Sequence, residues 1–177
     1  MKHIIHIQNI IKIMYPYSRS MKSSFDERTK KHVGLVQQVA KQLVDKYPDM
    51  AFLLKEVADH DHTKWLPNIV YGYVWMNAFY NLGIVYPSVK VSKLADYACD
   101  YHKWHENHHP EFWEKHFGSV QAMPIEAMAH MLCDWEAMSR EFSGNTREWY
   151  SNQHNKWDFS DKQRQDIDIL LTRIETL

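Results

Sequence analysis

The sequence predicts an all-α fold, a helical bundle with five or more core helices. Apolar residues recur every three to four positions in several segments, which is the spacing of one face of an α-helix. Only five glycines and six prolines occur among 177 residues, so tight turns are few, and this favours helices over a β-sandwich. Hydrophobic residues make up 45% of the chain and aromatic residues 14%, which argues for a packed core and against disorder.

Residues 1–20 are expected to form an N-terminal extension. Ile4, Ile7 and Ile11 share one helical face, with Ile10 beside them. Polar residues interrupt each apolar run and no small-residue cleavage site follows, so a signal peptide is not indicated. The stretch also falls short of the roughly 20 continuous apolar residues of a membrane span. We expect an amphipathic helix that packs on the domain or on a second subunit.

The first helices of the expected bundle lead to a His-Asp pair. Residues 24–27, Ser-Phe-Asp-Glu, read as a capping box that opens a helix, and the Tyr-Pro pair at residues 47–48 ends it. A second helix is expected over residues 49–61. A third follows over residues 71–82, and Gly83 closes it.

Three long helices and a short one complete the expected order. Their ranges are 92–108, 111–117, 124–142 and 160–177, with a Trp- and Tyr-rich connector at residues 149–159. Ser92 and Ser160 are the expected N-caps. Pro110 limits the first of these helices, because proline disfavours helical geometry at the residue before it. Since no linker or internal repeat interrupts the pattern, we expect residues 1–177 to form a single domain.

Charge and cysteine content restrict the classes of function. The net charge of −1 gives no basic surface of the kind that binds nucleic acid. The two cysteines, Cys99 and Cys133, form no CxxC motif, so neither a disulfide framework nor a structural zinc knuckle is expected. This usage is typical of the reducing cytosol, and we expect a cytoplasmic protein. No Gly-rich phosphate loop, nucleophile elbow or dinucleotide-binding fingerprint occurs in the sequence.

Four side chains, those of His32, His60, Asp61 and Asp134, are candidate metal ligands. A transition-metal ion accepts imidazole and carboxylate ligands together. His32 and Asp134 lie within expected helices among apolar residues, where a polar group needs a partner. The ordinary alternatives are a buried histidine bonded to a carbonyl, and a salt bridge for Asp134. The order His, His-Asp, Asp resembles the HD-domain superfamily of metal-dependent phosphohydrolases, which implies that all four hold one divalent ion.

Lys64 lies three positions after Asp61 and gives the pattern HDxxK. This form is similar to that of HD-GYP phosphodiesterases and of myo-inositol oxygenase, and the resemblance implies a lysine near the substrate. An ammonium group there can hold a phosphate oxygen. A solvated surface lysine is an equal alternative.

Twelve histidines occur in the chain, and four of them fall within residues 102–109. On a helix, His102, His105 and His109 share one face, while His108 is turned away by about a quarter of a turn. Binuclear HD proteins have two more histidine ligands between the His-Asp pair and the last aspartate, and this segment can provide them. We select His105 and His109 from their i,i+4 spacing, with His108 next. A solvated helix end is the alternative.

The chain as a whole resembles a phage and bacterial family catalogued as a domain of unknown function. The resemblance rests on His32, on the segments at residues 60–64, 107–111 and 133–139, and on Trp149-Tyr150. It covers roughly residues 30–175.

These features predict a metal-dependent phosphohydrolase that acts on a small phosphorylated compound, such as a nucleotide. The expected cofactor is one or two divalent transition-metal ions, with Fe, Mn, Zn, Co and Ni all compatible. Lys64, His105 and His109 are the candidate catalytic residues. The first alternative is a non-haem di-iron oxygenase, and the second is a metal-stabilised, non-enzymatic protein that binds a partner, such as a host protein in a phage setting. A homo-oligomer is compatible with the sequence, and no membrane association is expected.

Overall fold

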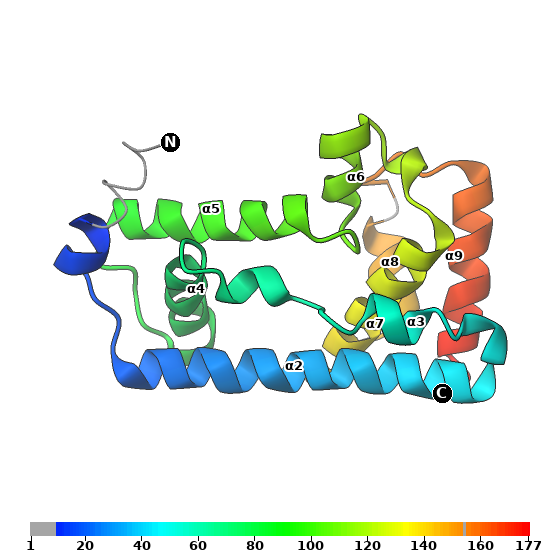
Figure 1. Ribbon diagram of the computed structural model, residues 1–177, viewed down its shortest axis with the longest axis horizontal. Coiled ribbons are helices and arrows are strands. Elements are labelled where there is room, and N and C mark those ends of the chain that lie inside the picture. The colour runs from blue at the N-terminus through cyan, green and yellow to red at the C-terminus, as the bar shows by residue number, and fades with distance from the viewer. Residues whose placement is uncertain (1–9, 154) are drawn as a thin grey trace. The chain divides into compact units, whose positions relative to one another are not determined.

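The computed structural model describes residues 10–153 and 155–177 (Figure 1). Within these residues the chain forms helices and turns and no strand, which confirms the predicted all-α class. The elements are α2 (Arg19–Lys46), η1 (Pro48–Met50), α3 (Leu53–Glu56), η2 (His62–Trp65), α4 (Val70–Leu82), α5 (Val89–His105), α6 (Pro110–Phe117), η3 (Val120–Ala122), α7 (Ile125–Phe142), α8 (Thr146–Gln153) and α9 (Asp161–Ile174). None of the helices in this described part is long and apolar enough to cross a bilayer.

The fold divides into two compact units, each made from two separate stretches of chain. The first unit combines the N-terminal stretch up to Lys30 with Asp61–His105, and the second combines Lys31–His60 with Glu106–Leu177. One boundary falls inside α2, and another falls on the peptide bond that joins His60 to Asp61. The single domain expected from the sequence stays a prediction.

Close packing of α4 on α5 forms the core of the first unit. At Gly72 in α4 the two backbones approach so closely that a Cβ atom would lie 2.6 Å from the Cβ of Ala98. Val74 and Val91 are fully buried beside this crossing. Ile11, within the expected N-terminal helix, is 6% exposed and belongs to the same cluster, whereas Ile4 and Ile7 lie outside the described residues.

The second unit is built around α7, which packs against α3 and α9. One face of α7 is apolar, and Met131 and Leu132 on it are fully buried. The later part of α2 adds Val36 and Leu43 to the same core. The start of α9 is the predicted one, because Ser160 and Gln163 form a reciprocal capping box.

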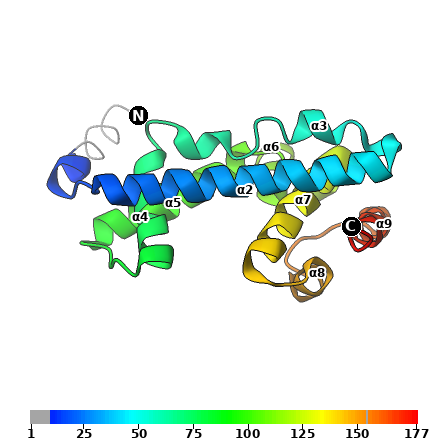
Figure 2. The same cartoon turned by 90° about the horizontal axis from the view of Figure 1, so that it is seen from below.

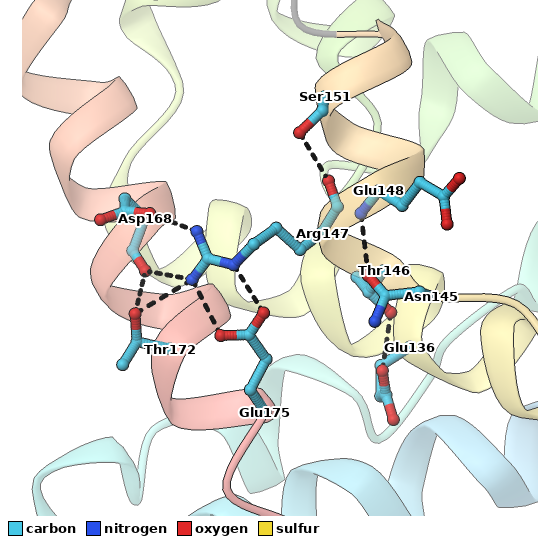
Figure 3. Close-up of polar contacts among 9 residues, drawn as sticks. All are labelled: Glu136, Asn145, Thr146, Arg147, Glu148, Ser151, Asp168, Thr172 and Glu175. Atoms are coloured by element: carbon cyan, nitrogen blue, oxygen red, sulfur yellow. Dashed lines mark hydrogen bonds and ion pairs between the residues drawn. The ribbon is translucent and has the colours of Figure 1, made fainter.

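Helix α8 lies beside α9, and Figure 2 shows both nearly end-on. Arg147 of α8 bonds the carboxylate of Glu175 through Nε (2.6 Å) and Nη2 (3.1 Å), and its Nη1 pairs with Asp168 (Figure 3). These two carboxylates raise the pKa of Arg147 above its usual value. The sequence predicted only a connector here. It missed α8, whose first turn is capped by the Asn145 side chain, which accepts the N–H of Glu148 at 2.9 Å.

Two other predicted helix starts were wrong. Helix α2 begins at Arg19, well before the Ser24 motif, because Ser18 Oγ accepts the N–H of Met21 (3.2 Å) and serves as the cap. Ser24 is inside the helix, where its Oγ accepts a hydrogen bond from Asn77 Nδ2 of α4 at 3.0 Å. In the same way α5 begins at Val89, because Ser88 Oγ accepts the N–H of Val91 (3.3 Å).

The chain around the His-Asp pair is not the continuous helix expected over residues 49–61. Helix α3 ends at Glu56, and His60 lies in the turn that follows. Asp61 adopts the left-handed conformation (φ 65°), which stops any helix, and short polar residues such as aspartate tolerate it. The polar side chain of Gln37 steadies this turn, because its Nε2 donates to the carbonyl oxygen of Ala58 at 3.3 Å.

Helix α5 also ends three residues earlier than predicted, at His105. His109 is extended (φ −95°, ψ 131°) and occupies the N-cap position of α6, in which Pro110 is the first residue. The sequence predicted that Pro110 would keep His109 out of a helix. It did not predict that the chain already leaves α5 at His105 and forms a turn over residues 106–108. His105 and His109 therefore do not share one helix, and their i,i+4 spacing places them on no common face.

Candidate metal centre

Helix α7 supplies two polar side chains to the interior of the second unit. His130 and Asp134 are one helical turn apart and so lie on the same face of the helix. His130 is 2% exposed, and the Asp134 side chain is 13% exposed. Their neighbours on α7 are apolar and buried, so these two residues need polar partners from other elements.

The partners of Asp134 are His32 from α2 and His60 from the turn after α3. His32 Nε2 lies 2.9 Å from Asp134 Oδ1, and His60 Nε2 lies 3.7 Å from the same oxygen. The two Nε2 atoms are 3.2 Å apart. Both histidines are buried, with 5% and 2% exposure. Within the second unit, the structure thus brings together His32, His60 and Asp134, which are three of the predicted ligands, as a triangle of one oxygen and two nitrogens.

The dimensions of this triangle fit one metal ion. Ligand atoms about 2.1 Å from an ion are separated by about 3.0 Å at a right angle and by about 3.6 Å at 120°. The three sides of 2.9, 3.2 and 3.7 Å span this range. Two imidazole nitrogens and a carboxylate oxygen so close together also need an N–H proton or a metal ion among them, because lone pairs alone would repel one another. The residues therefore fit the divalent ion expected from the sequence.

A second layer of imidazoles lies behind His60. Its Nδ1 is 3.0 Å from Nε2 of His130, and its ring centroid is 4.5 Å from that of His108. His108 is 1% exposed and also packs on His130, with ring centroids 4.4 Å apart. Nitrogen atoms of these three rings all lie within 4.8 Å of one another. The ring of His109 lies beside that of His108, with ring centroids 4.3 Å apart.

Asp61, the fourth predicted ligand, belongs to the first unit and has polar partners there. Its carboxylate is 1% exposed, and Lys64 Nζ lies 2.5 Å from Oδ2. His102 Nε2 lies 3.1 Å from Oδ1, while the Nδ1 atom of the same ring is 2.8 Å from Thr63 Oγ1. The ammonium of Lys64 also lies 5.5 Å from the ring centre of Tyr73.

This pairing bears on the predicted roles of Lys64 and His105. Lys64 neutralises a buried carboxylate, and a contact with substrate stays a prediction. His105 is exposed in the first unit; its ring stacks on Tyr101 with centroids 3.8 Å apart, and its Nδ1 is 2.7 Å from the Tyr101 carbonyl oxygen. A catalytic role for His105 also stays a prediction.

His130 was not among the ligands predicted from the sequence, although a signal was present. A histidine four residues before an aspartate on one helix places both on the same face, a spacing that occurs in metal sites built on helices. In the 102–109 cluster, helix geometry favoured His105 over His102, but His102 is buried, and its Nε2 lies 3.1 Å from Asp61 Oδ1.

A family model described as a family of unknown function, DUF5662, matches residues 21–173. The matched range includes both units from the first turn of α2 onward, with His32, His60, His130 and Asp134. No curated protein and no solved structure matches the chain.

Proposed function

We propose that this chain, which belongs to the DUF5662 family of unknown function, binds a divalent transition-metal ion and hydrolyses a small phosphorylated compound, such as a nucleotide. His32, His60 and Asp134 are the proposed ligands. The observation that carries the proposal is the triangle of their ligand atoms, with sides of 2.9, 3.2 and 3.7 Å.

The donor set suits this chemistry. Two imidazoles and one carboxylate occupy one side of an ion and leave its other positions open. An ion held there would supply Lewis-acid chemistry, because it withdraws electrons from a phosphoryl oxygen and lowers the pKa of water. Among the three ligands, Asp134 keeps the largest exposed fraction, 13% of its side chain, so solvent and substrate have access from its side.

The preference for a phosphorylated substrate rests on the order of the residues. His32, the pair His60-Asp61 and Asp134 follow one another as in the HD-domain phosphohydrolases. In this proposal the chain is a divergent relative of that superfamily, and its DUF5662 membership is compatible with such an origin.

A second candidate is a non-haem iron oxygenase. Two histidines and one carboxylate on one face are the ligand set of many iron(II) oxygenases, and His32, His60 and Asp134 have this composition. The two candidates differ in the metal that supports activity and in whether dioxygen is consumed.

The experiment compares metal content and turnover. The purified chain is stripped with a chelator, reloaded separately with Mn, Fe, Co, Ni or Zn, and tested for phosphate release from nucleoside mono-, di- and triphosphates. We expect the wild type to retain metal and release phosphate, and Asp134→Asn to lose both. Asp45→Asn, an exposed aspartate of α2 in the same unit, is the matched control and should behave as wild type. Oxygen consumption by the iron form without phosphate release would favour the oxygenase, and metal content unchanged by Asp134→Asn would refute the site.

A further inference from the structure

The protons on His60 are restricted by the partners of its two ring nitrogens. A neutral imidazole carries one N–H group and one lone pair. His60 Nε2 faces His32 and Asp134, at 3.2 and 3.7 Å, and Nδ1 faces Nε2 of His130 at 3.0 Å. If Nε2 offers its lone pair to an ion, the proton must be on Nδ1. His60 then donates a hydrogen bond to His130 Nε2.

The same condition selects the tautomer of His130. If His60 donates to His130 Nε2, a neutral His130 carries its own proton on Nδ1. Metal-binding histidines commonly donate their second N–H to a carboxylate or a carbonyl oxygen, which orients the ring and selects the tautomer. Here a second imidazole is placed to accept this bond. Because His130 is one turn before Asp134 on α7, one helix positions both a ligand and the support of another ligand.

We infer that His130 is a positioning residue that holds His60 in its metal-binding tautomer, and that the site therefore takes one ion per chain and not two. A second ion in the group of His60, His108 and His130 would need lone pairs from at least two of these rings. Two of the nitrogens are already committed to the bond between His60 and His130. This inference rests on the proposed metal site. The sequence led us to expect one or two ions, and the inference reduces this number to one.

The test compares two substitutions at residue 130. In His130→Gln the amide oxygen stands near the place of Nε2 and can still accept the bond from His60, whereas His130→Leu removes the acceptor at similar size. The dissociation constant and stoichiometry for Co²⁺ are measured by competition with a coloured chelator, and the visible absorption of bound Co²⁺ reports the ligand geometry. His116→Leu, an exposed histidine on α6 in the same unit, is the control.

We expect the wild type to bind one Co²⁺ per chain, and His130→Leu to bind it about 10- to 100-fold more weakly, the range seen when the partner of a metal-binding histidine is removed. His130→Gln should stay within about threefold of wild type and keep its spectrum, because the acceptor is restored. A merely structural role would not give this difference between Gln and Leu.

Each contrary result identifies what is wrong. Two ions bound per wild-type chain would overturn the inference even if His130→Leu failed to fold. Equal affinities of wild type and His130→Leu, or equal weakening by Gln and Leu, would overturn it while leaving the proposed site intact. A wild type that binds no Co²⁺ would overturn the proposed site together with the inference.

Discussion

Replacement of Gly72 by alanine tests the packing of the first unit. A Cβ at this position would meet the carbonyl oxygen of Leu94 and lie 2.6 Å from the Cβ of Ala98. Carbon atoms pack at about 3.5–4.0 Å, so α4 and α5 would have to separate by roughly 1 Å. Overpacking of this kind costs about 1–3 kcal/mol. The higher helix propensity of alanine offsets about 0.5–1 kcal/mol of this. We expect a net loss of about 0–2.5 kcal/mol in the free energy of unfolding.

Gly34 provides the matched control for this substitution. It is also a helical glycine, in α2, but a Cβ there would have no neighbour within 4 Å. Gly34→Ala should therefore stabilise the protein by about 0.5–1 kcal/mol. Both variants are compared with wild type by urea denaturation followed by circular dichroism. If Gly72→Ala raises the urea midpoint, as Gly34→Ala is expected to do, the close approach of α4 and α5 is refuted.

Three further predictions concern buried polar groups and the metal. Cys133 is fully buried, and burial raises the pKa of its thiol. A thiol reagent applied to the native protein should therefore label the partly exposed Cys99 and reach Cys133 only after unfolding. Equal labelling of the two cysteines in a mass spectrum would contradict the burial of Cys133. Lys64→Met leaves the buried Asp61 carboxylate without its ammonium partner and should lower the free energy of unfolding by at least about 1 kcal/mol, whereas an unchanged urea midpoint would mean that Lys64 has no structural role. Removal of metal by a chelator should lower the melting temperature. Adding back an ion at about 100 times its dissociation constant should restore about 2.7 kcal/mol of the free energy of unfolding. A melting temperature that does not change with metal would argue against a site in the folded state.

Local chemistry made several helix ends predictable. Gly83 adopts the left-handed conformation that closes α4, and Ser160 with Gln163 starts α9, as the sequence indicates. The error at Ser24 has a physical reason. A Ser-x-x-Glu pattern can also occur within a helix, and only the packing of α4 against α2 gives Ser24 its partner in Asn77.

Part of the candidate site was also predictable from local sequence. His32 and Asp134 are polar residues among apolar ones, which a sequence reveals, and the structure joins both to His60. The role that we infer for His130 depends on a contact with a residue 70 positions away along the chain, and no local pattern encodes that contact. The left-handed turn at Asp61 was equally hidden, because aspartate is compatible with both helix and turn.

The most direct test of the proposed metal centre is the position of the ion. Crystals of the protein grown with Zn²⁺ or Fe²⁺ would give an anomalous diffraction signal at the absorption edge of the metal. We predict one peak, about 2.0–2.2 Å from His32 Nε2, His60 Nε2 and Asp134 Oδ1, with no second peak between His60 and His130. A peak held by other residues, or no peak from protein saturated with metal, would contradict the account.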